Sequence, residues 1–331
     1  MRTFDELTTL GKARRLRPLA LNALAQYGFD VDRLELIRND LNGIFRVRTT
    51  GGQSYLLRVC LPHHHDLATL ESEIIWLQAL AYEAAIAAPL PIPARNGQMV
   101  VTADAAGVPE ERRCMLFSWL PGRNLQHAPT TEGFERLGQL MARLHDHTED
   151  WQPPAAFRVR TYNRLYPMGA PDGLLGSMQR KRFDAETRAL IEAMEARITA
   201  ELERLFRASR PQVLHTDLHW GNVKSYRDRL QPLDFEDLAW GFPVQDAAIT
   251  FFYSLRGERF PELREAFQRG YATLRDWPEE YSGQVDLLMV HRALELHNYM
   301  LSTGFPGAER WFPAFVDNIH GRYRELLRLS D

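Results

Sequence analysis

The fold is decided by the stretch His215-Thr216-Asp217-Leu218-His219-Trp220-Gly221-Asn222, with Asp234 following twelve residues after Asn222. The stretch contains the pattern His-x-Asp-x-x-x-x-Asn, which at ~5% per fixed position and ~330 starting points should arise by chance about 0.04 times per chain. The Asp-Phe pair at residues 234–235 makes a chance match rarer still. Each aspartate taken alone would be expected to lie in a turn or cap a helix. The combined spacing instead indicates one functional site.

Asp217 and Asn222 have the separation of the catalytic aspartate and metal-binding asparagine in kinase catalytic loops. Asp234 stands where a short hairpin would return a second metal-binding aspartate. Transfer of a γ-phosphoryl group requires a divalent metal on its oxygens, and magnesium prefers ligands such as an Asn carbonyl and an Asp carboxylate. We therefore expect Asn222 and Asp234 to bind magnesium and Asp217 to act as the base. Asp237 is either a further metal ligand or a residue that organises the following turn.

Composition limits the class of protein before any motif is considered. The 331 residues are 45% hydrophobic and 25% charged, and 40 basic against 43 acidic side chains leave a formal charge of -3. This balance excludes a strongly basic nucleic-acid binder. Two cysteines exclude a disulfide framework, and no apolar run is long enough for the signal peptide or membrane span that we would otherwise expect. We expect a cytoplasmic protein without nucleic-acid or membrane partners.

The front part of the chain is rich in predicted strands. Helical spacing of apolar residues predicts helices over residues 14–27 and 68–83, and a proline-rich stretch at 89–93 ends the second one. Short apolar runs separated by turn residues predict strands at 34–37, 44–47, 55–59, 99–102 and 114–119. The first three strands should form a meander.

The rear part is mostly helical. Apolar stripes predict helices over residues 134–144, 190–205, 244–256, 261–274, 284–302 and 311–328. A β-like segment at residues 213–233 interrupts them and contains the motif. The sequence thus predicts an α+β protein of two unequal lobes. We place a small β-rich nucleotide-binding lobe at residues 1–119 and a larger catalytic and acceptor-binding lobe at 120–331.

At these residues the chain resembles the aminoglycoside phosphotransferase and choline kinase-like superfamily. The signature of that superfamily is a His-Gly-Asp-Leu-His-x-Gly-Asn loop followed by an Asp-Phe segment, and this sequence matches it except that Thr216 replaces the glycine. Further resemblance lies in residues 42–47, 55–59, 72–77, 116–122 and 241–246, so it covers most of the chain. Within the superfamily the sequence is most similar to the branch of stress response kinase A and type II homoserine kinase-like proteins. The resemblance implies a two-lobed protein-kinase-like fold that binds ATP and magnesium.

The resemblance also implies nucleotide-binding residues. Arg58 would contact the α- and β-phosphates, and Glu73 would hold Arg58 from the following helix. Arg58 stands where protein kinases place lysine. The sequence contains no P-loop, so covering the phosphates would fall to residues 39–45, which include Asn42. The backbone around Phe117 and Trp119 would contact the adenine.

These features predict an ATP- and Mg-dependent phosphotransferase that acts on the hydroxyl of a small molecule, such as an amino alcohol, a sugar or a homoserine-like compound. A Ser/Thr protein kinase of the stress response kinase A type is the alternative. A nucleotide-binding pseudokinase is a third hypothesis, against which the presence of all the proposed carboxylates argues. A cationic acceptor would call for acidic or aromatic side chains. Acidic residues are available at Glu279, Glu280, Asp286 and Glu295, but nothing in the sequence places them near Asp217. Aromatic residues are available at Trp119, Trp240, Phe242, Trp277 and Trp311, and we expect them to lie in the core more often than in an acceptor pocket.

Two further features receive structural interpretations. His63, His64 and His65 are consecutive, but adjacent side chains of one loop rarely converge on one ion, so we expect a solvated loop. Asp246 precedes an apolar helical segment and is expected to be its N-cap.

Overall fold

A computed structural model describes residues 3–4, 6–39, 41–127, 129–254, 257–305 and 307–328. Among these residues, no helix combines the length and the apolar composition needed to cross a membrane. The chain forms two units. The first comprises Met1–Arg123, Gln152–Val159 and Lys224–Glu236, and the second comprises Asn124–Trp151, Arg160–Val223 and Asp237–Asp331. The first lobe was expected to end at residue 119, whereas the first unit also includes two later segments of the chain.

The first unit is built on an antiparallel sheet of order β1-β2-β3-β6-β4, in which β5 also pairs with β6. The strands are β1 (Val31–Asn39), β2 (Gly43–Thr49), β3 (Ser54–Val59), β4 (Pro91–Ile92), β5 (Val100–Ala103) and β6 (Arg112–Ser118). The predicted meander is confirmed as β1 to β3, and β5 and β6 match the two later strands. β4 was not predicted, because Pro91 was interpreted only as part of a proline-rich helix stop.

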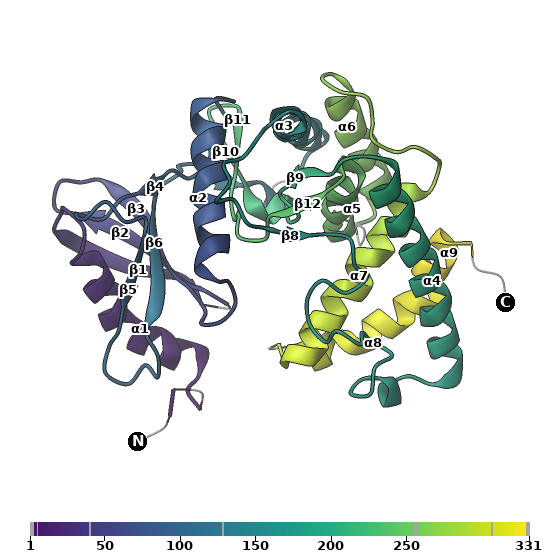
Figure 1. The fold of residues 1–331 in the computed structure, drawn as a ribbon, viewed down its shortest axis with the longest axis horizontal. Helices are drawn as coiled ribbons and strands as arrows, with labels where there is room; N and C mark the ends of the chain where they lie inside the picture. Colours follow the sequence, from purple (N-terminus) through teal and green to yellow (C-terminus); the bar gives the residue numbers. More distant parts are fainter. Residues whose placement is uncertain are drawn as a thin grey trace. The chain divides into compact units, whose positions relative to one another are not determined.

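Helix α1 (Thr9–Leu24) lies along one face of this sheet (Figure 1). Its buried side chains, among them Leu19 and Ala23, pack with Phe45 and Leu57 of the strands in one hydrophobic core. The helix begins five residues earlier than the predicted residue 14, because Thr8 caps it by accepting a hydrogen bond from the Gly11 N–H at 3.2 Å. Burial of this apolar face against the sheet stabilises the unit.

Helix α2 (Leu67–Tyr82) follows β3 and is capped by Asp66, which accepts a hydrogen bond from Thr69 N at 2.8 Å. The hairpin of β10 (Val223–Tyr226) and β11 (Arg229–Pro232) belongs to a three-stranded sheet of order β11-β10-β7, where β7 is Arg123–Asn124. After β11 the chain returns to α2, where the rings of Trp76 and Phe235 meet edge to face with centroids 5.4 Å apart. This contact fixes the segment that carries Asp234.

The second unit is mostly helical, as predicted. It contains α3 (Thr131–Glu149), α4 (Ala185–Ala208), α5 (Pro243–Ser254), α6 (Phe260–Ala272), α7 (Gln284–Thr303), α8 (Ala308–Asn318) and α9 (Arg324–Leu326). The helix predicted over 311–328 is wrong in its continuity, since a π-helical turn at Ile319–Tyr323 separates α8 from α9. A small sheet of order β8-β12-β9 (Arg160–Thr161, Ala239–Gly241 and Gln212–Leu214) lies among these helices (Figure 1).

Helices α3 and α6 approach each other at two glycines. A Cβ atom added to Gly270 would lie 1.8 Å from the Glu135 carbonyl oxygen, and one added to Gly138 would lie 2.0 Å from the Phe267 carbonyl oxygen. The two backbones are therefore in direct contact, and only glycine fits at either position. This packing supports α3, whose His145 takes part in the site described next.

Candidate active site

The loop that follows β9 is held by one buried carboxylate, that of Asp246. Its Oδ1 accepts a hydrogen bond from Thr216 N at 2.8 Å, and its Oδ2 accepts one from His215 N at 3.2 Å. His145 Nε2 of α3 lies 3.2 Å from the same Oδ2. Burial opposes ionisation of Asp246, but the hydrogen bond and charge of His145, with those of His215 and Thr216, hold its pKa below the ordinary value.

Asp246 is the fourth residue of α5, so the expectation that it is an N-cap is wrong. The carboxylate still lies in the first turn of the helix, where the helix dipole favours a negative charge. It serves the preceding loop instead of the helix backbone.

Thr216 occupies the position where the resembled signature has glycine, and its φ of 59° lies in the left-handed region. A β-branched residue in this region is strained. The structure offsets the strain with two hydrogen bonds: Thr216 N donates to Asp246, and the Thr216 hydroxyl donates to the Asp237 carbonyl oxygen. Although threonine replaces the glycine of the signature, Thr216 adopts the left-handed backbone conformation that glycine would adopt without strain.

The Asp217 carboxylate receives hydrogen bonds on both oxygens. Asn222 Nδ2 donates to Oδ2 at 2.7 Å, and Arg292 Nη2 of α7 donates to Oδ1 at 3.0 Å. Asn222 Nδ2 also donates to the Asp217 carbonyl oxygen at 3.0 Å. Since its amide nitrogen faces Asp217, the Asn222 carbonyl oxygen is the atom that would face a metal ion, as the sequence interpretation requires.

Arg292 is almost fully buried and has several acidic or phenolic partners. Its Nη1 donates to Glu295 Oε2 at 3.0 Å, and its Nη2 donates to the Tyr253 hydroxyl at 3.0 Å. The Tyr162 hydroxyl in turn donates to Glu295, which is fully buried. Burial opposes the charge of Arg292, but Tyr253, Glu295 and Asp217 hold its pKa well above the ordinary value. Arg292 therefore places a permanent cation beside the Asp217 carboxylate.

His219 lies on the other side of Asp217. Its Nδ1 accepts a hydrogen bond from Gly221 N at 2.9 Å, which places the proton of a neutral imidazole on Nε2. Nε2 lies 3.6 Å from Asp217 Oδ2. The ring also packs on Tyr253, with centroids 4.2 Å apart. His219 therefore braces the loop, as does His215, whose Nδ1 accepts from Asp217 N at 3.3 Å.

In the first unit, Arg58 and Glu73 form the expected pair. Arg58 Nη1 donates to Glu73 Oε1 at 3.1 Å and Nη2 donates to Oε2, so the pairing is bidentate. Both residues are buried, with 4% and 3% of their surfaces exposed. Burial opposes the charge of Arg58, but the carboxylates of Glu73 and Glu236 keep its pKa well above the ordinary value. A lysine could not make the same two-atom contact.

Asn42 contributes to this cluster. Its Oδ1 accepts from Leu61 N at 2.8 Å and its Nδ2 donates to Glu236 Oε2 at 2.5 Å. Arg58 Nη1 lies 3.5 Å from the same Glu236 oxygen. The structure thus brings together Arg58, Glu73 and Asn42, with Glu236 as a member that the sequence did not reveal. Asp40, within the predicted phosphate loop 39–45, lies outside the described residues.

Asp234 also belongs to the first unit, whereas Asp217 and Asn222 belong to the second. Asp234 has a φ of 62°, and its Oδ2 accepts a hydrogen bond from Arg38 Nη2 at 3.1 Å. The partly exposed carboxylate is chemically suited to magnesium.

The segment predicted to contact adenine is the end of β6 and the residues after it. The Phe117 ring lies against the Arg58 guanidinium at 5.2 Å, and the Trp119 ring lies between Lys224 and Arg46, at 4.3 Å and 4.5 Å. These aromatic rings already have cationic neighbours within the unit. Any contact with adenine through this segment would therefore come from its backbone.

The acidic residues weighed for a cationic acceptor have structural partners instead. Glu280 pairs with Arg204, Asp286 with Arg264, and Glu295 with Arg292. Glu279 accepts hydrogen bonds from Gly283 N and Val285 N at the start of α7.

Asp237 pairs with Arg160 at 3.2 Å, which favours its interpretation as an organiser of the turn. Trp311, however, lines a pocket of the second unit.

Sequence reasoning missed Arg292 and Tyr253. A signal for Arg292 was present, because it interrupts the apolar run of residues 287–294, and a charged residue on a buried helix face must have a partner. The partner could not be identified, because Asp217 is 75 residues away in sequence.

Comparison with known proteins identifies the class. The chain matches the model of the phosphotransferase enzyme family over residues 34–281, which is more than half of its length. It therefore belongs to this family and is a phosphotransferase, as the resemblance implied. Amicoumacin kinase of Bacillus subtilis (strain 168) is 20% identical over 295 residues, covering 84% of this chain and 81% of that protein. An uncharacterized protein of Synechocystis sp. is 26% identical over 268 residues, covering 78% of this chain and 71% of that protein.

Solved structures confirm the two-part fold. A structure titled amicoumacin kinase in complex with AMP-PNP, Ca2+ and Ami has a TM-score of 0.75 at 16% identity, covering 96% of each chain. A microcompartment-associated aminopropanol kinase has a TM-score of 0.70 at 23% identity, covering 91% of this chain and 99% of that one. The aminoglycoside phosphotransferase APH(4)-Ia gives 0.62 at 15% identity, with coverage of 91% and 97%. The narrower placement beside stress response kinase A and type II homoserine kinase-like proteins stays a prediction.

Proposed function

We propose that this protein transfers the γ-phosphate of ATP to the hydroxyl group of a small amino alcohol. The observation that carries the proposal is the Asp217 carboxylate, oriented by Asn222 and Arg292 on its two oxygens. Family membership supports the phosphotransferase reaction. The complex of a structural neighbour with AMP-PNP and Ca2+ supports ATP and a divalent cation as cofactors.

In this proposal each residue has a distinct task. Asp217 accepts a hydrogen bond from the acceptor hydroxyl and takes its proton, while the new O–P bond forms and the bond from the γ-phosphorus to the bridging oxygen of ADP breaks. Arg58, oriented by Glu73, contacts the α- and β-phosphates. The Asn222 carbonyl oxygen and the Asp234 carboxylate would hold Mg2+, which neutralises charge on the phosphoryl oxygens when bound.

The acceptor class is inferred from a pocket of about 200 Å³ in the second unit. It is lined by Phe252, Tyr253, Leu296, His297, Met300 and Trp311. Tyr253 reaches from this pocket to Arg292, the partner of Asp217. The face of Trp311 can attract an ammonium group through cation–π interaction, which an amino alcohol would supply. The name of one neighbour, aminopropanol kinase, agrees with an acceptor of this kind.

The test is magnesium-dependent ADP formation by the wild type and by Asp217→Asn across amino alcohols, sugars, homoserine-like compounds and a generic protein. We expect turnover with an amino alcohol and a fall in kcat of about 10²–10⁴-fold in the variant, with ATP affinity retained. Trp311→Ala should raise KM for the amino alcohol without changing KM for ATP.

Transfer to protein alone would overturn the acceptor class and favour a Ser/Thr kinase. Equal turnover by Asp217→Asn would overturn the assignment of the base.

A further inference from the structure

Three side chains of metal-ligating type come together in the first unit, and one of them also contacts Arg58 and Asn42. They are His64 and His65, in the loop between β3 and α2, and Glu236, after β11. One ligand atom from each residue lies within 4.8 Å of the other two. Two imidazole nitrogens and a carboxylate oxygen are the donors that Zn2+ and its neighbours in the first transition row prefer.

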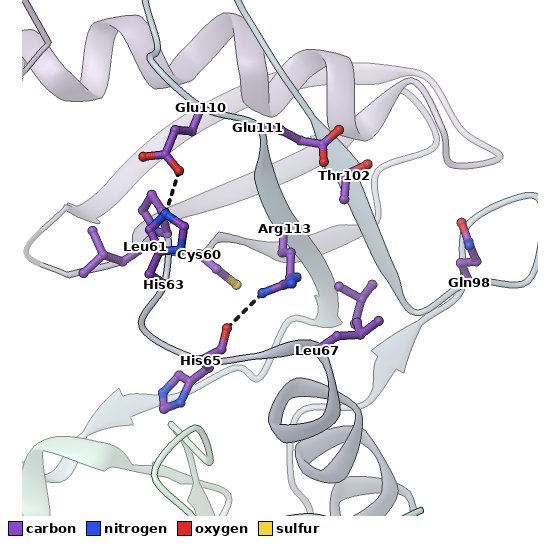
Figure 2. A pocket seen from close by; sticks show the side chains of 12 residues that line it. Cys60, Leu61, His63, His65, Leu67, Gln98, Thr102, Glu110, Glu111 and Arg113 are labelled. Atoms are coloured by element: carbon purple, nitrogen blue, oxygen red, sulfur yellow. Dashed lines mark hydrogen bonds and ion pairs between the residues drawn. The ribbon is translucent and has the colours of Figure 1, made fainter. Parts of the chain in front are cut away.

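The loop separates the three consecutive histidines. His63 has a φ of 58°, and its Nε2 lies 2.8 Å from Glu110 Oε2. The carbonyl oxygen of His65 accepts a hydrogen bond from Arg113 Nη1 at 3.0 Å. Figure 2 shows the His63 and His65 rings directed to opposite sides of the loop. The expectation of a solvated loop thus holds for His63, whose side chain is 84% exposed, but not for its two half-buried neighbours.

The sequence argued against a metal site here because adjacent side chains of one loop rarely converge on one ion, but the folded structure adds a ligand from another segment. Adjacent side chains need a third ligand from elsewhere in the chain, and Glu236 supplies it from 171 residues beyond His65. The His64 and His65 ring centroids are 4.3 Å apart, so both imidazoles are on the same side of the loop. Zn–N and Zn–O bonds of about 2.0–2.1 Å imply tetrahedral ligand atoms roughly 3.4 Å apart, which small side-chain rotations would achieve.

Charge in the same region favours a cation. Glu236 and Glu73 both face the Arg58 guanidinium, at 3.5 Å and 3.1 Å, so two carboxylates lie close together in this region. Asn42 adds a neutral hydrogen bond to Glu236 but no charge. A divalent ion bound to Glu236 would place a positive charge beside these carboxylates.

We propose that His64, His65 and Glu236 form a binding site for a Zn2+-class transition-metal ion, with water in the fourth position. The ion would join the loop after β3 to the segment that carries Asp234, and so stabilise the first unit. Hard Mg2+ prefers oxygen ligands and retains its water, which separates this site from the proposed magnesium ligands Asn222 and Asp234. The proposal does not depend on the phosphotransferase acceptor.

The test is titration of the chelator-treated full chain with Co2+, followed by visible absorption. We expect one equivalent of Co2+ with the intense bands of a four-coordinate ion, displacement by Zn2+, and persistence in millimolar Mg2+. His64→Ala and His65→Ala should each weaken binding at least about tenfold. His63→Ala is the matched control, because it removes a histidine from the same run but outside the cluster, and it should bind Co2+ as the wild type does.

A second measurement guards against misfolding of the variants. Zn2+ should raise the Tm of the wild type and of His63→Ala, whereas His65→Ala should keep the metal-free Tm and show no rise. Equal weakening by His63→Ala and His65→Ala would show binding by an unstructured histidine run and overturn the site. Unchanged affinity in Glu236→Gln, or loss of the Co2+ spectrum in Mg2+, would also overturn it.

Discussion

Arg292 Nη2 lies 3.0 Å from Asp217 Oδ1, and the two side chains are only 4% and 17% exposed. This ion pair and the hydrogen bond from Asn222 hold the carboxylate in one orientation. Transfer of a γ-phosphoryl group proceeds through a loose transition state in which the acceptor hydroxyl needs orientation more than early deprotonation. In the proposed reaction, the ion pair would hold the Asp217 carboxylate where it can orient the acceptor hydroxyl.

Removal of the cation should be costly for stability. Arg292→Met would leave Asp217 and Glu295 without their shared partner, and we expect the free energy of unfolding to fall by about 3–5 kcal/mol. Arg292→Lys should lose less stability, because it keeps the charge, but should still lower kcat since lysine cannot contact both carboxylates as the planar group does. Urea unfolding and steady-state kinetics measure the two effects. A methionine variant as stable as the wild type would contradict this view of the cluster.

Thr216 allows its backbone strain to be separated from its hydrogen bond. Thr216→Ala keeps the left-handed φ and loses the hydroxyl contact with Asp237, and should be destabilised by about 1–2 kcal/mol. Thr216→Gly loses the same contact but relieves the strain, so it should be more stable than the alanine variant by about 1 kcal/mol. Chemical unfolding of the three proteins gives the order. An alanine variant equal to or above the glycine variant would show that no strain is stored there.

The contact of α3 with α6 predicts a sharp difference between two glycines. Gly270→Ala would drive a methyl group against the Glu135 carbonyl oxygen and should lower the free energy of unfolding by about 1–3 kcal/mol or more. Gly321→Ala is the control, because nothing lies within 4 Å of the added Cβ. That variant should be neutral or more stable by up to about 1 kcal/mol. Similar thermal unfolding of the two variants would refute the close approach of the helices.

Asp246 predicts a pH dependence of stability. Its pKa is lower in the folded protein than the ordinary value of 3.8, so the folded state binds fewer protons than the unfolded state in this range. The stabilisation is complete above the ordinary value and is lost as the pH falls through the folded pKa. Wild-type stability should therefore drop more steeply below about pH 4 than that of Asp246→Asn, with the two curves converging in acid. Parallel curves from denaturant unfolding at several pH values would exclude this role.

The sequence predicted those parts of the molecule that depend on local pattern. The meander, α2 and the helical rear part follow from apolar spacing, and the loop with Asp217 and Asn222 follows from a spacing of five residues. The expected pairing of Arg58 with Glu73 is present, because a strand and the next helix bring them together over 15 residues. Their contact with phosphates remains a prediction.

The remaining features arise from contacts between residues distant in the sequence. From local sequence, Asp246 is simply an acidic residue near the start of a helix. Only the tertiary fold reveals that its carboxylate accepts hydrogen bonds from the backbone of residues 215 and 216. No sequence pattern singled out Glu236, which lies two residues after Asp234, although its carboxylate faces both Arg58 and Asn42. The last helix is interrupted by a π-helical turn at Ile319–Tyr323, and the sequence of this turn contains no helix-breaking residue except the permissive Gly321.

The position of Asp246 also has a consequence for the order in which the chain folds. Its partner His145 is 101 residues away in sequence. The two loop amides that donate hydrogen bonds to it are 30 and 31 residues away. Closing chain segments of this length is slow and depends on the helices having already docked. The loop bearing Asp217 therefore reaches its final conformation late. Amides of this loop should exchange hydrogen through partial opening before the helices around it unfold, so catalytic competence is acquired after the scaffold and lost before it.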